Sequence, residues 1–99
     1  MKVYRGKRLD GGTEITVNGK PLRHVVRHSP TGMEWGYGGS GPADLALSIL
    51  TDCFNVPEVE RLYGSFKWEI VAGLPRENWE LTEEQIREWA DKKLACSPF

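Results

Sequence analysis

The sequence is short of cysteine and has no long apolar run. Cys53 and Cys96 are its two cysteines, and the lack of any C-x-x-C pair argues against a disulfide framework and a cysteine zinc site. No stretch of 18 apolar residues occurs, and the first residues lack the apolar stretch of a signal peptide. We therefore expect a soluble, cytoplasmic protein that does not bind a membrane.

An excess of one charge is also missing. Thirteen Lys and Arg residues face fourteen Asp and Glu residues, so the net charge of −1 creates no field that would draw the chain to nucleic acid. Residues 1–41 carry seven basic and three acidic residues, whereas residues 42–99 carry six and eleven. The basic part permits an anion site, although two ordinary solvated surfaces explain the same pattern. The acidic part and the lack of an RNP-type motif disfavour nucleic acid as a partner.

The composition is that of one globular domain. Its 99 residues fit a single domain, 1–99, and the hydrophobic content of 39% argues against disorder. Four tryptophans enlarge the area that a small core can bury.

Alternating and β-branched segments predict an antiparallel sheet of about four to five strands. Asn18-Gly19 is typical of a type I′ hairpin, and Pro21 places the returning segment at a sheet edge. Ser29-Pro30-Thr31-Gly32 suits a type I turn between two further segments. The expected strands cover residues 2–9, 13–17, 20–22, 23–28, 33–37 and 65–72.

Helices are expected in three places, which makes the fold class α+β. Residues 43–54 are apolar around most of the helix and predict a buried central helix. Asn55 and Glu58 form a capping box for a short helix that ends at Gly64. Thr82 and Gln85 form another for an amphipathic C-terminal helix, which carries Glu83–Arg87 and Glu88–Lys92 pairs at i, i+4.

The glycine-rich segment 36–41 matches G-x-G-x-x-G between an expected strand and a helix. Its strand belongs to an antiparallel hairpin, and no acidic residue follows at the spacing that a dinucleotide-binding unit requires. Pro42-Ala43 stand where a phosphate-binding Walker loop has Lys-Ser/Thr. No cofactor is therefore expected.

Two explanations of the glycines remain open. They can permit a tight passage from strand to helix against the core. Alternatively, the backbone N–H groups at the start of the helix can bind a small anion or nucleotide, with nearby cations and aromatic rings supplying countercharge and a stacking surface. The residues of this ligand site would be Arg5, Arg27, His28, Trp35, Tyr37, Gly38, Gly39, Ser40, Gly41 and Lys67.

Catalytic and metal-binding residues are not expected. His24 and His28 lie four apart on an expected strand, about 13 Å from one another, which is too far for one metal ion. Both are expected to be exposed or cross-strand residues. Ser40 lacks the G-x-S-x-G context of a nucleophile and suits a helix cap. Asp44 suits the first turn of the central helix.

The block Trp35-Gly-Tyr-Gly-Gly-Ser-Gly-Pro-Ala-Asp-Leu-Ala-Leu-Ser-Ile-Leu50, with Val3-Tyr4-Arg5-Gly6 and Phe66-Lys67-Trp68-Glu69, resembles a small family of uncharacterised bacterial and phage proteins. The resemblance implies a compact domain of unknown function, often encoded beside mobile elements, and it assigns no catalytic role, so whether the protein is an enzyme stays open, with a non-enzyme favoured. Two hypotheses follow. One is a non-enzymatic binding module for an anion or nucleotide. The other is a phage or mobile-element protein that binds and regulates or inhibits a host protein.

Overall fold

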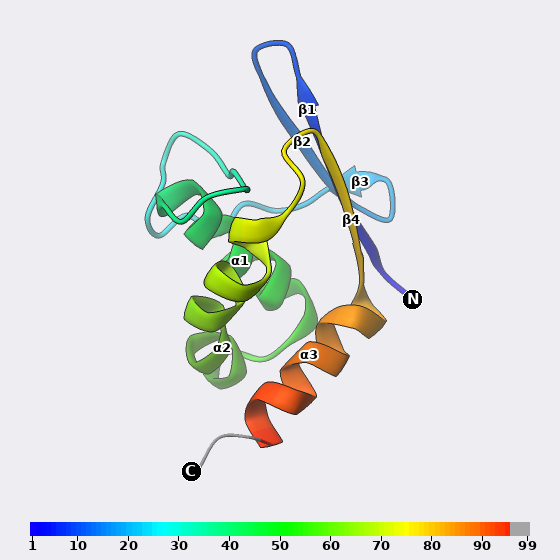
Figure 1. The fold of residues 1–99 in the computed structure, drawn as a ribbon, viewed down its shortest axis with the longest axis vertical. Coiled ribbons are helices and arrows are strands. Elements are labelled where there is room, and N and C mark those ends of the chain that lie inside the picture. Colours follow the sequence, from blue (N-terminus) through cyan, green and yellow to red (C-terminus); the bar gives the residue numbers. More distant parts are fainter. Residues whose placement is uncertain (96–99) are drawn as a thin grey trace.

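A four-stranded antiparallel sheet and three helices make up residues 1–95, the part that the computed structural model of the chain describes (Figure 1). The strand order is β3-β2-β1-β4, so the expected α+β class is confirmed. Cys96, which the sequence places in a tail, lies outside the described residues. In chain order the elements are β1 (Val3–Leu9), β2 (Gly12–Val17), β3 (Lys20–Pro21), α1 (Ser40–Cys53), α2 (Val56–Glu69), the short 3-10 helix η1 (Val71–Gly73), β4 (Asn78–Thr82) and α3 (Glu83–Ala95).

The first three strands form as the turn residues predict. Asn18 and Gly19, between β2 and β3, have φ angles of 51° and 81°, the two positive values that a type I′ turn requires. The two-residue β3 contains Pro21 and lies at the edge of the sheet, where a missing N–H costs no ladder bond. The prediction of this hairpin from its turn residues is therefore confirmed.

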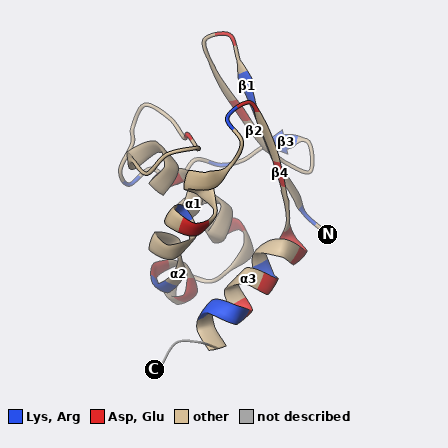
Figure 2. Ribbon diagram, in the orientation of Figure 1, with Lys and Arg blue, Asp and Glu red and all other residues tan. Residues whose placement is uncertain are grey.

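One face of the sheet packs on the helices and the other is open. Gly6 pairs with Ile15 on one side and with Trp79 on the other, and all three residues are buried. Their neighbours along the strands point the opposite way, and there Arg5 pairs with Glu80 at 2.8 Å. Residues of both charge signs also occur on α2 and α3 (Figure 2).

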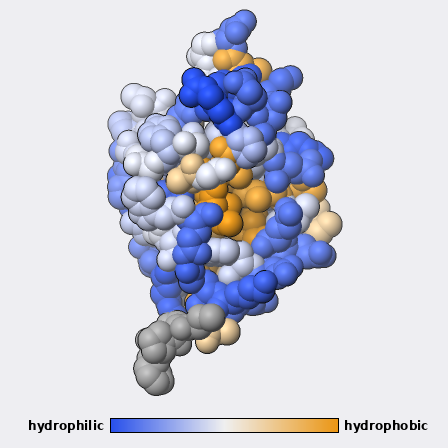
Figure 3. Space-filling view, viewed as in Figure 1, coloured by the Kyte–Doolittle hydropathy of each residue, from blue (hydrophilic) through white to orange (hydrophobic). Residues whose placement is uncertain are grey.

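Helix α1 is the centre of the core, as expected. Every residue from Gly41 to Leu50 is buried. Helix α2 packs beside it with Val59, Leu62 and Phe66, and α3 contributes Ile86 and Ala90. Apolar residues gather at the centre of one face of the molecule, surrounded by hydrophilic ones (Figure 3).

Both expected capping boxes are confirmed. The N–H of Glu58 donates to Asn55 Oδ1 at 3.1 Å, and the N–H of Gln85 donates to Thr82 Oγ1 at 3.1 Å. The reciprocal bonds are also present, so each box satisfies two N–H groups at its helix start. The ion pairs of α3 form at 2.9 Å for Glu83–Arg87 and 3.7 Å for Glu88–Lys92.

The expected strands at 23–28 and 33–37 are wrong. Residues 23–36 form no strand and pass over α1 instead (Figure 1). The backbone donors of this segment bond to side chains of the helix rather than to a neighbouring strand. The N–H of Val25 donates to Ser48 Oγ at 2.8 Å, and three further N–H groups donate to Asp44. The segment was predicted as strand, but its backbone N–H groups bond to α1 and not to another strand.

The expected strand at 65–72 and the helix end at Gly64 are also wrong, because α2 continues through Gly64 to Glu69. Val59, Leu62 and Phe66 are buried at spacings of three and four, which is the period of a helix face. The sheet instead gains β4, which follows η1 and pairs with the free side of β1. Sequence analysis did not identify this strand.

Asp44 holds the 23–36 segment on α1. Its side chain is fully buried, and it accepts hydrogen bonds from His24 Nε2 at 2.8 Å, from the N–H of His28 at 2.9 Å and from that of Ser29 at 3.0 Å. The N–H of Arg27 adds a longer bond at 3.2 Å. Asp44 is thus not a solvated first-turn acid, and His24 is not a free surface histidine.

The pKa of Asp44 reflects the same contacts. Burial by itself would raise the pKa, but the hydrogen bonds from His24 and from the backbone of His28, Ser29 and Arg27 outweigh burial and lower the pKa below its usual value. The charged form is therefore the form that the fold stabilises.

We predict that Asp44→Asn lowers the free energy of unfolding by about 3 kcal/mol, because a buried carboxylate with several donors is replaced by a neutral group that cannot accept them all. Urea denaturation at pH 7 measures the effect. Asp91→Asn, at an exposed position of α3, is the control and should change stability by less than about 0.5 kcal/mol. Equal effects of the two substitutions would contradict the role of Asp44.

The lowered pKa gives a separate prediction for pH. A carboxyl group whose pKa is depressed by folding stabilises the protein above its unfolded pKa of about 3.9, and this contribution is lost as pH falls through the folded pKa. The difference in unfolding free energy between the natural chain and Asp44→Asn should shrink below about pH 4, as the carboxyl group takes up its proton. Comparing the two proteins cancels the titration of all other carboxylates, and a difference independent of pH would refute the assignment.

Candidate functional site

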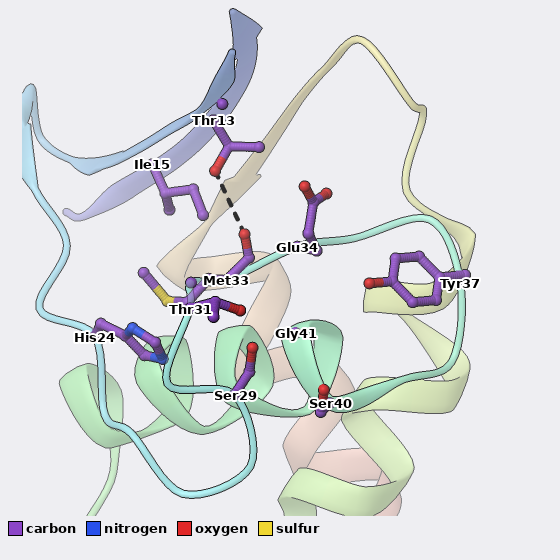
Figure 4. A pocket seen from close by; sticks show the side chains of 12 residues that line it. Thr13, Ile15, His24, Ser29, Thr31, Met33, Glu34, Tyr37, Ser40 and Gly41 are labelled. Atoms are coloured by element: carbon purple, nitrogen blue, oxygen red, sulfur yellow. Dashed lines mark hydrogen bonds between the residues drawn. The ribbon is translucent and has the colours of Figure 1, made fainter.

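The amino end of α1 lies between two hollows in the surface. The larger has a volume of about 520 Å³ and the smaller of about 340 Å³, and Ser40 lines both. Figure 4 shows the larger hollow, which lies between β2, the 23–36 segment and the first turn of α1. Its lining residues are Gly12, Thr13, Ile15, His24, Ser29, Thr31, Gly32, Met33, Glu34, Tyr37, Ser40 and Gly41. Those of the smaller hollow are His28, Gly39, Ser40, Ala43, Tyr63, Gly64 and Lys67.

The helix end itself carries no side-chain cap. Gly39 is the N-cap residue, with an extended backbone, and it offers no side chain that could accept a first-turn N–H. Ser40, expected as a cap, is instead the first residue of the helix. Pro42 has no N–H, and the N–H of Ala43 donates to the Gly39 carbonyl at 3.0 Å. The N–H groups of Ser40 and Gly41 thus remain without an intrahelical acceptor, and Ser40 is exposed.

Two basic residues reach the smaller hollow from different elements. Lys67 comes from α2, one turn after Tyr63, and its Nζ lies 4.4 Å from the ring centroid of Trp68. Within residues 1–95 no carboxylate lies within ion-pair distance of Lys67 Nζ. His28 comes from the segment held by Asp44, and its ring stacks on Tyr63 at 6.0 Å. Positive charge, a hydroxyl and free N–H groups therefore meet at one helix end.

The structure brings most of the predicted ligand residues to these hollows. His28, Gly39, Ser40 and Lys67 line the smaller one, and Ser40, Tyr37 and Gly41 line the larger.

The other four, Arg5, Arg27, Trp35 and Gly38, line neither hollow, and Gly38 lies against the ring of Trp68. Arg5 is on the open face of the sheet, and Arg27 forms a two-fold hydrogen bond with Glu60 at 3.0 and 2.7 Å. Trp35 is 2% exposed and donates from Nε1 to two backbone carbonyls, so its ring is a core element. Its neighbours there are Trp79, edge-on at 5.7 Å, and the guanidinium of Arg8, 4.7 Å above the ring.

The glycines of the 36–41 segment have packing roles. Gly36 has a φ of +86°, which side-chain-bearing residues rarely adopt. A Cβ at Gly41 would lie 2.9 Å from Glu34 Cβ, so this glycine lets the 23–36 segment approach the first turn of α1. Cβ atoms at Gly38 and Gly39 would overlap the rings of Trp68 and Tyr37. The tight-passage explanation therefore accounts for these positions, and the glycines shape the hollows at the same time.

Three lining residues, Tyr63, Ser29 and Thr31, were not predicted from the sequence. Tyr63 and Lys67 lie one helical turn apart, a relation that is visible only if α2 is extended past Gly64. Ser29 and Thr31 reach the hollow because the 23–36 segment folds onto α1, and no local pattern encodes that placement.

Two other classes of site find no support in residues 1–95. No group of three or more His, Cys, Asp or Glu side chains in this part of the chain is arranged to hold a metal ion. None of the helices described is both long enough and apolar enough to cross a membrane.

Comparison with known proteins places the chain in a family but assigns it no activity. The family described as "Family of unknown function (DUF6166)" matches residues 4–92. No curated protein and no solved structure matches the chain.

We predict opposite stability changes for two glycine substitutions near the site. Gly41→Ala should destabilise the fold by about 1–3 kcal/mol, because the new methyl group meets Glu34, including its backbone N at 3.2 Å. Gly64→Ala should stabilise it by about 0.5–1 kcal/mol, since this glycine lies inside α2 with nothing within 4 Å of the added Cβ. Thermal unfolding of the two variants measures both effects, and a neutral Gly41→Ala would show that close packing there is not required.

Proposed function

Because the chain belongs to a family of unknown function, DUF6166, its activity has to be inferred from its own site, and we propose that it is a non-enzymatic binding module for a small anion of the phosphate class. The ligand occupies the smaller hollow at the amino end of α1. One observation carries the proposal. An uncapped helix start and the side chains of Lys67 and His28 line the same hollow of about 340 Å³.

The electrostatics of this hollow favour an anion over a cation. The peptide dipoles of α1 place partial positive charge at its amino end, and Lys67 adds a full charge. No aspartate or glutamate is among the lining residues. The hydroxyl of Ser40 and the free N–H groups of the first turn supply donors of the kind that phosphate oxygens accept.

Cys53 gives no support to covalent catalysis. Burial raises the pKa of its partly buried thiol, and Cys53 Sγ lies 2.9 Å from the Tyr4 hydroxyl at the edge of the core. A thiol that stays protonated is a poor nucleophile.

A second candidate is a protein-contact surface, as a regulator of a host protein would need. Trp68 is 62% exposed and Tyr37 is 53% exposed, and both rings lie on the glycine-rich turn. Exposed aromatic residues are enriched in protein interfaces, where tryptophan is a frequent energetic centre. This surface adjoins the anion site and does not replace it.

We predict that titration calorimetry with inorganic phosphate detects binding at low ionic strength, and that Lys67→Ala weakens the affinity about 5- to 20-fold by removing the lysine charge from the hollow. Lys92→Ala is the matched control. Lys92 is an exposed lysine of α3 that pairs with Glu88 and does not line the hollow. The control should leave the affinity unchanged, and added salt should weaken binding by the natural chain.

The two candidate functions give different results with Trp68→Ala. An anion site still binds phosphate in this variant, because Lys67 stays in the hollow and loses only the Trp68 ring 4.4 Å from its Nζ, whereas a protein-contact surface loses its partner. No heat with millimolar phosphate in the natural chain would reject the anion site.

A further inference from the structure

We propose that the natural ligand is a mononucleotide, whose phosphate lies in the smaller hollow and whose nucleoside lies in the larger one against the ring of Tyr37. This inference rests on the proposed function and names its ligand class. It starts from the arrangement of the two hollows, which share Ser40 and therefore adjoin one another at the first residue of α1. A single ligand that fills both must carry an anionic group next to a larger second part.

The larger hollow is polar, but its charged groups are already paired. The carboxylate of Glu34 receives two bonds from the Arg8 guanidinium, at 3.0 and 3.2 Å, and His24 is bonded to the buried Asp44 at 2.8 Å. What remains toward the hollow is a set of hydroxyl groups from Ser29, Thr31, Tyr37 and Ser40, together with that of Thr13, which also donates to the Met33 carbonyl at 3.4 Å. Such a lining suits an uncharged partner with several donors and acceptors, as ribose and the edges of a base provide.

The volume fits the same ligand class. About 520 Å³ lies within the range of sites that enclose small molecules, and it exceeds what a phosphate ion alone would occupy. Lys67 and His28 line the smaller hollow, whereas most of the hydroxyls line the larger one, whose charged groups are paired within the protein, so an anionic part and a neutral polar part of one ligand would find different surroundings.

Tyr37 supplies the stacking surface. Its side chain is 53% exposed, and its hydroxyl points across the larger hollow from the outer side (Figure 4). The ring lies over Gly39, where a Cβ would stand 2.6 Å from Cε2 of the ring. The missing side chain at Gly39 therefore permits the ring position. A half-exposed aromatic ring at the mouth of a polar hollow can stack on a base of any kind.

The test is titration calorimetry of the natural chain with inorganic phosphate, ribose 5-phosphate, AMP and UMP in one buffer. AMP and UMP should bind at least about 10-fold more tightly than phosphate, and ribose 5-phosphate should lie between them, because stacking adds to the phosphate contacts. Tyr37→Ala should weaken AMP binding about 5- to 100-fold and leave phosphate binding unchanged.

Gly39→Ala tests the ring position without removing the ring. The backbone at Gly39, with φ −146° and ψ −166°, is accessible to alanine, so the fold is retained while the methyl group displaces Tyr37. This variant should also lower the ratio of AMP to phosphate affinity. Trp68→Ala is the matched aromatic control, because Trp68 lies on the neighbouring Gly38 and lines neither hollow. Its ratio of AMP to phosphate affinity should equal that of the natural chain.

The outcomes separate the two proposals. Phosphate binding without a gain for AMP or UMP, or equal affinities for ribose 5-phosphate and AMP, would overturn the nucleotide assignment and leave the anion site standing. A lowered AMP ratio in Trp68→Ala with none in Tyr37→Ala would likewise overturn the assignment to the larger hollow. Absence of binding by every probe would reject both proposals.

Discussion

The carboxylate of Asp44 is buried in the most enclosed helix of the protein, and its charge is balanced by hydrogen bonds rather than by a lysine or an arginine. One histidine and the N–H groups of three consecutive residues, 27–29, surround it. A buried charge is tolerated only if such donors are in place. The side chain therefore specifies the path of a long segment that has no secondary structure of its own.

The geometry of the two hollows depends on these hydrogen bonds of Asp44. The segment bound to Asp44 carries His28 into the smaller hollow and Ser29 into the larger one. Farther along, Arg8 of the sheet holds Glu34 and lies over the ring of Trp35, which fixes the approach to the glycine-rich turn. The 23–36 segment is thus attached to α1 through Asp44 and to β1 through Arg8, and the hollows lie where this segment passes over the helices and the sheet.

Local sequence patterns correctly predicted those turns and helix ends whose backbone groups bond to residues nearby in the sequence. Asn18-Gly19 and Thr82 with Gln85 each contain within a few residues the groups that satisfy their own backbone, so their turn and cap could be predicted. The segments 23–28 and 65–72 were misassigned because their structure depends on distant partners. The first is held by Asp44, and the second is helical because Phe66 packs against α1. The glycines predicted a candidate anion site at the start of α1 and Lys67 was among its predicted residues, but Tyr63, the other α2 side chain that lines the smaller hollow, was not predicted.

The attachment through one carboxylate has a consequence for the thermodynamics of any ligand. Since four donors converge on a single side chain, any opening of the 23–29 segment would break those four bonds together with the bond of Val25 to Ser48. Only the attached state encloses the hollows. A ligand that binds in the hollows can bind only those molecules in which the 23–29 segment is attached. The measured affinity therefore equals the intrinsic affinity multiplied by the attached fraction. Changes in the core that shift this population would then tune binding without touching the ligand.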